Sequence, residues 1–130
     1  SVILTGGEPL LSYDVHLYNE LRRVGVSTIA VETNGSVRTR APLDYVSCSP
    51  KCAEHVVYKN WPDGVDELRY VRAEAQGIPN PAVKAKRIFL SPEFAGGILR
   101  KNNLEWCLSL VKDHPRWSLS VQLHKFLGVR

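Results

Sequence analysis

The apolar, β-branched runs of this chain end abruptly in short polar or glycine-rich turns. These turns are Gly6-Gly7-Glu8, Glu32-Thr33-Asn34, Ser49-Pro50-Lys51, Ser91-Pro92-Glu93 and Gln122-Leu123-His124-Lys125. Helical patterns alternate with the runs, which predicts an α/β fold with a parallel sheet. Carboxyl ends of parallel strands lie along one edge, where open sheets and barrels place their ligands. We therefore expect the turns to converge on one crevice.

The strand pattern is regular enough to assign boundaries. We expect strands at residues 2–4, 28–31, 45–47, 67–71, 87–90 and 118–121. Residues 73–86, in which a glycine and two prolines stand close together, are expected to be mostly loop. No long helix fits between residues 52 and 66, because Trp61-Pro62-Asp63-Gly64 is a turn signal.

One helix is predicted after the first strand and another before the last strand. Ser12 is a candidate N-cap for a helix that turns Leu17, Leu21 and Val24 toward the sheet, with Gly25 as its left-handed stop. A last helix is expected over residues 103–113. It would open on a capping-box-like pair, Asn102 and Glu105, and end before His114-Pro115.

Composition limits the class of protein. The 130 residues fit a single domain, 1–130, and 44% apolar with 23% charged residues is ordinary for a globular chain. The net charge of +4 comes from scattered cations, which favours a solvated basic surface over a nucleic-acid partner. We expect no membrane span. Three cysteines without secretory signals favour a reducing cytoplasm over a disulfide scaffold.

The chain opens within an expected strand and contains no methionine. We therefore interpret it as a fragment of a longer protein. A strand missing from the beginning would leave a sheet edge exposed, and exposed edges tend to pair with another chain. A homodimer formed through that edge is accordingly expected.

The segment Gly6-Gly7-Glu8-Pro9 has a physical logic of its own. Two glycines at a strand end let backbone groups approach a ligand without an intervening Cβ. A carboxylate beside them can hold an ammonium group, and a proline fixes the exit of the turn. Taken alone, a Gly-Gly pair is equally compatible with a simple tight turn.

Read together, the motifs resemble one family. Val2-Ile3-Leu4-Thr5-Gly6-Gly7-Glu8-Pro9 is similar to the segment of radical S-adenosylmethionine (SAM) enzymes that binds the amino group of SAM. The segments 44–51, ending in Ser-Pro-Lys, and 118–130, containing Gln-x-His-Lys-x-x-Gly, resemble the 7-carboxy-7-deazaguanine synthases. The resemblance spans the chain in order. It implies a parallel-stranded partial (β/α)6 barrel, TIM-like and truncated at its N-terminus.

The resemblance also implies site residues. Those at SAM-binding positions are Gly6, Gly7, Glu8, Ser49, Pro50, Lys51, Ser91, Pro92, Glu93 and Phe94. Those at substrate-binding positions are Thr5, His124 and Arg130. Ser91 stands where the family usually has glutamine, which puts that hydrogen bond in doubt. No residue of this chain is assigned a catalytic or metal-binding role.

The family reaction is a radical ring contraction. The resemblance implies SAM, a 4Fe–4S cluster, Mg²⁺, a flavodoxin-type reductant and a small pterin substrate, 6-carboxy-5,6,7,8-tetrahydropterin. The product of the family reaction is 7-carboxy-7-deazaguanine, a precursor of queuosine and other deazapurines. The cluster needs a C-x3-C-x2-C loop, which this sequence does not contain, so we expect the chain alone to be inactive.

Cys48, Cys52 and His55 imitate the cluster spacing, with a histidine in third place. We interpret the match as coincidence, because Cys48 falls in an expected strand and a zinc site would want a fourth ligand. Cys107, in the last expected helix, is most simply a core residue.

Two other functions remain open at this point. The first is another radical SAM enzyme, such as a glycyl-radical activase, which would share the glycine turn but not the terminal motif. The second is a non-catalytic module that binds SAM or another nucleotide in the crevice. A cluster loop in a longer reading frame would support an enzyme over the binding module.

Overall fold

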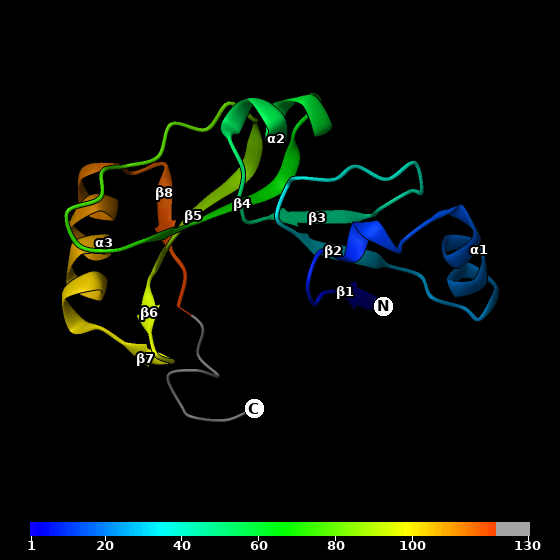
Figure 1. Cartoon of the computed structure of the whole chain (residues 1–130), viewed down its shortest axis with the longest axis horizontal. Coiled ribbons are helices and arrows are strands. Elements are labelled where there is room, and N and C mark those ends of the chain that lie inside the picture. Colours follow the sequence, from blue (N-terminus) through cyan, green and yellow to red (C-terminus); the bar gives the residue numbers. More distant parts are fainter. Residues whose placement is uncertain (122–130) are drawn as a thin grey trace. The chain divides into compact units, whose positions relative to one another are not determined.

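The computed structural model describes residues 1–121 and divides them into two compact units. Unit 1 comprises Ser1–Leu68 and Pro81–Lys86, and unit 2 comprises Arg69–Asn80 together with the chain from Arg87 onward. Two long strands, β4 (Val65–Arg72) and β5 (Ala85–Pro92), run through both units (Figure 1). The expected α/β class is confirmed, with a six-stranded sheet of order β1-β2-β3-β4-β5-β8.

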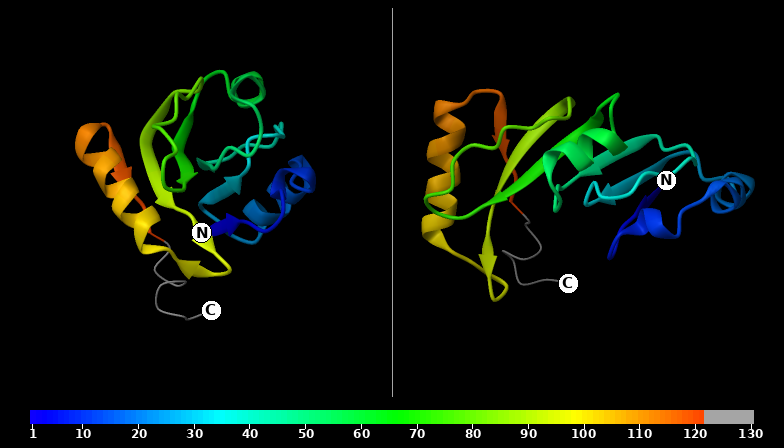
Figure 2. Two further views of the ribbon diagram at one scale, coloured as in Figure 1. Left: turned by 60° about the vertical axis from the view of Figure 1, so that its left-hand side comes forward. Right: turned by 45° about the horizontal axis from the view of Figure 1, so that its top comes forward.

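Unit 1 is built on parallel strands. Its elements are β1 (Val2–Leu4), a 3-10 turn (Pro9–Leu11), α1 (Val15–Arg23), β2 (Ile29–Thr33), β3 (Tyr45–Cys48), α2 (Glu54–Asn60) and the beginning of β4. The first three strands lie side by side in every view (Figure 2). Their register pairs Leu4 with Val31, Val31 with Val46, and Cys48 with Leu68.

Unit 2 packs one long helix against parallel strands. It contains most of β5, α3 (Lys101–Asp113), β8 (Trp117–Leu119) and a small hairpin of β6 (Phe94–Ala95) and β7 (Ile98–Leu99). Strand β8 is parallel to β5, with Leu90 opposite Leu119. The Tyr70 and Trp117 rings meet edge to face, 5.8 Å apart.

Each unit buries its own apolar side chains. In unit 1, Ile29, Val57 and Leu68 are fully buried, as the β-branched and aliphatic pattern predicts. In unit 2, Leu90 and Cys107 are fully buried, so the expectation that Cys107 is a core residue is confirmed. No helix among residues 1–121 is long and apolar enough to cross a membrane.

The first helix differs from expectation in two respects. Its N-cap is Asp14, whose carboxylate accepts the Leu17 N–H at 2.8 Å, rather than Ser12. Ser12 instead closes the preceding 3-10 turn by donating its backbone N–H to the Pro9 carbonyl. The expected apolar face is also only partly covered, because Leu21 is half-buried while Leu17 and Val24 are exposed. The left-handed stop at Gly25 is confirmed, with φ +89°.

Several boundaries also differ. Glu32 and Thr33 belong to strand β2, and Ser91 and Pro92 to strand β5, where turns were expected. The short helix α2 and the β6–β7 hairpin were not expected. The capping-box assignment for the last helix is wrong, since α3 begins after Arg100 without a side-chain cap and Asn102 donates to Glu74 instead.

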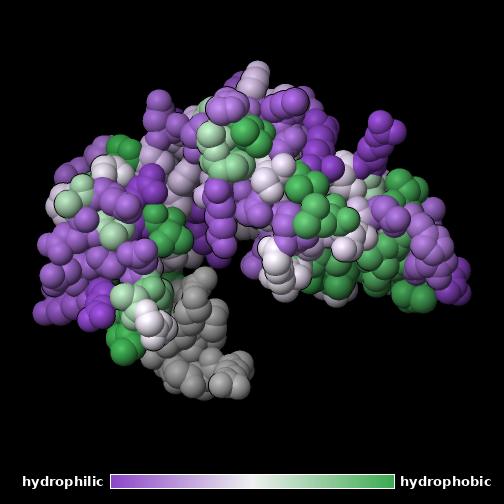
Figure 3. Space-filling model, viewed as in Figure 1, coloured by the Kyte–Doolittle hydropathy of each residue, from purple (hydrophilic) through white to green (hydrophobic). Residues whose placement is uncertain are grey.

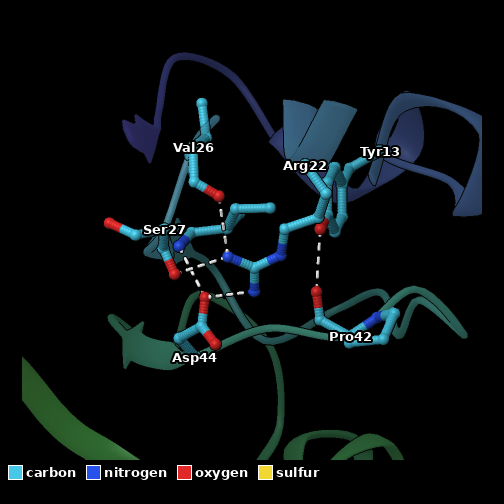
Figure 4. Close-up of polar contacts among 7 residues, drawn as sticks. Tyr13, Arg22, Val26, Ser27, Pro42 and Asp44 are labelled. Atoms are coloured by element: carbon cyan, nitrogen blue, oxygen red, sulfur yellow. Dashed lines mark hydrogen bonds and ion pairs between the residues drawn. The ribbon is translucent and has the colours of Figure 1, made fainter. Parts of the chain in front are cut away.

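Arg22 ties the end of α1 to the beginnings of β2 and β3 (Figure 4). Its guanidinium donates to the Val26 and Ser27 carbonyls and forms an ion pair with Asp44 at 2.7 Å. The Asp44 carboxylate also accepts the Ile29 N–H at 2.7 Å. This hydrogen bond, and then the one from Arg22, lower the pKa of Asp44 below its ordinary value.

This cluster gives a pH-dependent prediction. A carboxyl group with a lowered folded-state pKa contributes stability above its unfolded pKa, and that stability is lost as pH falls through the folded value. Asp44→Asn is therefore expected to lower the melting temperature at pH 7 and to flatten its decline below about pH 4, the ordinary range of an aspartate. Thermal melts by circular dichroism between pH 3 and 7 measure both effects. An unchanged acid limb would show that Asp44 does not couple to folding.

Strand β1 stands at one end of the sheet order. Ile3 within it is 63% exposed, and Leu11, Val15 and Val24 nearby in unit 1 are also exposed. Figure 3 shows apolar side chains gathered over this part of unit 1. The expected edge is thus present in the structure, and the homodimer that was expected to use it stays a prediction.

Candidate functional site

A cleft of about 350 Å³ lies at the carboxyl ends of β1, β2 and β3. It is lined by Thr5, Gly6, Gly7, Glu32, Thr33, Asn34, Ser49 and Lys51. These residues come from the first three of the turns that the sequence was expected to bring together. The volume is at the lower end of the range of small-molecule sites, roughly 300–1,000 Å³.

The glycine turn gives the cleft an open wall. Gly6 has φ +95°, a left-handed conformation that side chains rarely adopt. A Cβ built on Gly6 or Gly7 would meet no heavy atom within 4 Å. Ligand atoms therefore have access to the backbone of both glycines.

Thr5 and Glu32 form a polar pair inside the cleft. They follow Leu4 and Val31, which are register partners, so their side chains lie on the same face of the sheet. The Thr5 hydroxyl donates to Glu32 Oε2 at 3.2 Å. From the sequence, Glu32 was expected only as part of a polar turn and was assigned no ligand-binding role. The signal that could have identified it is a carboxylate directly after a predicted parallel strand.

The polar row continues across the sheet. Glu32 is paired in register with Ser47, and Ser47 with Glu67 on β4. Ser47 and Glu67 are each 9% exposed, and the Ser47 hydroxyl donates to Glu67 at 3.3 Å. The acceptors of the cleft thus belong to a line of polar side chains on one face of unit 1.

The carboxylate of Glu8 accepts hydrogen bonds from three other residues of the chain. Its two carboxylate oxygens accept the Leu10 N–H at 3.2 Å, the Thr33 hydroxyl at 2.9 Å and the Asn34 N–H at 2.8 Å. The first bond closes the turn that follows Gly7, and the other two reach the end of β2.

The Asn34–Gly35 turn positions the second wall. The backbone carbonyls of Thr33 and Asn34 hold the Ser49–Lys51 turn in place. The Ser49 N–H donates to the Thr33 carbonyl at 2.8 Å, and the Lys51 N–H donates to the Asn34 carbonyl at 3.1 Å. Gly35 has φ +82° and packs against Cys48. Lys51 itself is exposed and lines the cleft, so its ammonium group is accessible to a ligand at this wall.

The cysteines near this wall carry protonated thiols and are not assembled into a metal site in the described part of the chain. Burial raises the pKa of Cys48 to about 12, and burial also raises the pKa of Cys52. A thiol must lose its proton to become a ligand, so these shifts oppose it. Among residues 1–121, no group of three histidine, cysteine, aspartate or glutamate side chains is placed to hold a metal ion.

The other predicted site residues are not among those that line the cleft. Ser91 to Phe94 belong to unit 2, where the Ser91 hydroxyl donates to the Ser120 carbonyl at 2.8 Å. The backbone N–H of Glu93 donates to the Arg72 carbonyl at 3.0 Å, and the backbone carbonyl of Glu93 accepts from the Asn103 side-chain amide at 3.0 Å. His124 and Arg130 fall outside the described residues. Their expected roles stay predictions, as does that of Pro50.

Comparison with known protein sequences identifies one group of relatives. No family model matches the chain. A 7-carboxy-7-deazaguanine synthase of Caulobacter vibrioides is 35% identical over 98% of this chain, and one of Bradyrhizobium diazoefficiens is 37% identical over 99%. A third, of Bacteroides thetaiotaomicron, is 34% identical over 100%.

The chain spans 59% of the length of the first two of these relatives and 65% of the third. The similarity therefore covers nearly all of this chain, including every residue that lines the cleft, but only part of each relative. Over its length, the chain is homologous to the 7-carboxy-7-deazaguanine synthases.

Proposed function

We propose that the cleft of unit 1 forms part of the SAM- and pterin-binding site of a radical SAM lyase. The whole protein would convert 6-carboxy-5,6,7,8-tetrahydropterin to 7-carboxy-7-deazaguanine. The observation that carries the proposal is the convergence of the glycine turn, the Thr5–Glu32 pair and the Ser49–Lys51 turn on one cleft. The names of the relatives support the reaction.

The residues present fit the amino-acid end of SAM. The open backbone of Gly6 and Gly7 offers carbonyl groups to an ammonium group, and no side chain stands in the way. Lys51 supplies a cation for a carboxylate, and Ser49 a hydroxyl for either a carboxylate or a ribose. In this proposal, these residues orient SAM, whose cleavage in the whole enzyme supplies the radical chemistry.

Glu32 is the natural partner for a pterin. The 2-amino-4-oxo edge of a pterin presents two N–H donors side by side, which a carboxylate can accept together. Thr5 holds one oxygen of Glu32 at 3.2 Å and so restrains the orientation of the carboxylate. We assign Thr5 and Glu32 to substrate recognition, with His124 and Arg130 as further candidates by resemblance.

The described residues do not fit the 4Fe–4S cluster or Mg²⁺. The thiols of Cys48 and Cys52 have raised pKa values, and no metal-ligating group is assembled around them. We propose that the ligands of both belong to the part of the whole protein that this chain does not span. On that proposal, the chain alone is inactive, and its sheet forms part of a (β/α)6 barrel.

The test uses the protein at the length of its relatives, reconstituted anaerobically with iron and sulfide. SAM, a reductant, Mg²⁺ and 6-carboxytetrahydropterin are added, and 7-carboxy-7-deazaguanine is expected by mass spectrometry. SAM cleavage without that product would retain the radical SAM class but remove the substrate. Absence of cleavage by cluster-loaded protein would overturn the enzymatic proposal.

Glu32→Gln is expected to raise the KM for the pterin about tenfold while leaving the Kd for SAM within about twofold. The amide has one acceptor oxygen instead of two, and a charge-assisted hydrogen bond contributes roughly 1.5–3 kcal/mol. Steady-state kinetics and calorimetry measure the two constants. Glu20→Gln, which removes an exposed carboxylate paired with Arg23, is the matched control. Equal losses for both ligands would contradict the assignment.

A further inference from the structure

Glu8 is the only acidic residue of the glycine turn, and in the SAM-binding site proposed above it is the obvious acceptor for the ammonium group. Its hydrogen bonds point to a different role. An ionised carboxylate offers about four acceptor positions. Three donors of the chain itself already occupy Glu8: two backbone N–H groups, of Leu10 and Asn34, and the hydroxyl of Thr33.

The donors come from two different walls of the cleft. Leu10 follows the glycine turn, whereas Thr33 and Asn34 lie 25 and 26 residues after Glu8, at the end of β2. The Thr33 side chain is 3% exposed and also accepts the Gly35 N–H at 3.1 Å. Asn34 in turn accepts the Lys51 N–H. A continuous chain of hydrogen bonds thus runs from Glu8 through Thr33 and Asn34 to the turn of Lys51.

We infer that Glu8 is a positioning residue that fixes the glycine turn to the Thr33–Asn34 turn and leaves the ligand's ammonium group to backbone carbonyls. The inference rests on the proposed function, since it concerns how the same site is shaped for SAM. The two possible roles of Glu8, positioning the turn and contacting the ammonium group directly, predict different binding results. Loss of a positioning residue weakens every ligand of the cleft, whereas loss of an ionic partner weakens only ligands that carry the ammonium group.

The experiment combines variants with a ligand analogue. Glu8→Gln, Thr33→Val and Thr33→Ser are compared with wild type for binding of SAM and of the SAM analogue whose α-amino group is replaced by hydrogen. The cluster-loaded protein at the length of its relatives is used, with calorimetry as the readout. Glu8→Gln and Thr33→Val are expected to weaken both ligands by about the same factor, roughly tenfold. Thr33→Ser, which keeps the hydroxyl, is expected to bind nearly as wild type.

A loss confined to SAM in Glu8→Gln, with the analogue unaffected, would overturn the inference in favour of direct ionic contact. Amide hydrogen exchange of the ligand-free protein tests the connection made by Glu8 independently of whether the protein binds SAM. Exchange at Asn34 is expected to accelerate about tenfold in Glu8→Gln and Thr33→Val, but not in Thr33→Ser. If wild type binds no SAM while this exchange pattern holds, the proposed function fails and the connection made by Glu8 stands. Unchanged Asn34 exchange in Glu8→Gln would overturn the inference itself.

Discussion

Gly64→Ala is expected to lower the free energy of unfolding by about 2–5 kcal/mol, combining backbone strain with overpacking. Gly64 has φ +99°, and a Cβ at this position would lie 2.8 Å from the backbone oxygen of Lys84. That oxygen accepts the Val65 N–H at 3.0 Å, so it cannot retreat without breaking the pairing where β4 begins. Urea denaturation followed by circular dichroism measures the loss.

Gly25→Ala is the matched control. Gly25 has a similar φ, +89°, but a Cβ there meets no heavy atom within 4 Å. Its replacement should therefore cost only the backbone strain, about 1–2 kcal/mol. The difference between the two variants isolates the contact with Lys84. Equal losses would show that the Lys84 carbonyl moves aside at no cost.

The parallel sheet was predictable because its signals are local. Short β-branched runs such as Ile29-Ala30-Val31 and Tyr45-Val46 bury alternate or successive side chains, and their spacing by helical segments permits little else. Convergence of the following turns then needs only the geometry of a parallel sheet. The cleft walls at Gly6, Thr33 and Ser49 were thus foreseeable without knowledge of any side-chain contact.

Strand ends and caps were less predictable because several residues compete for one role. Ser12 and Asp14 are both good N-caps, and the choice depends on the 3-10 turn that Pro9 initiates. Glu32 and Thr33 look like turn residues by composition, yet pairing with Ser47 and Cys48 keeps them in β2. Propensity is overridden here by register, which a single sequence does not specify.

The hydrogen-bond partners of Glu8 could not be predicted from the sequence motif. A carboxylate beside two glycines suggests an ionic site, because the neighbouring residues are all that a motif contains. Two of its three donors, the Thr33 hydroxyl and the Asn34 N–H, are 25 and 26 residues away, at the end of another strand. The pairing of β1 with β2 brings these donors next to Glu8. The role of Glu8 therefore follows from the assembled sheet rather than from its motif.

Gly35→Ala is expected to affect stability and ligand binding together. The residue has φ +82°, and a Cβ would lie 3.0 Å from Cys48 Sγ and 3.2 Å from both methyl groups of Val57. These neighbours are fully buried and hold their places in the core. Strain and crowding should together cost about 2–4 kcal/mol in urea denaturation. Because Gly35 follows the Thr33–Asn34 wall, the SAM binding proposed for the whole protein should weaken in parallel.

A double-mutant cycle with Cys48→Ala tests the cause. Removing the sulfur opens the space nearest to the new methyl group, so Gly35→Ala should cost about 1 kcal/mol less in that background than in wild type. The backbone strain remains in both. If the cost is the same in both backgrounds, crowding against Cys48 is not its source, and the left-handed conformation together with the Val57 methyl groups makes glycine necessary at this position.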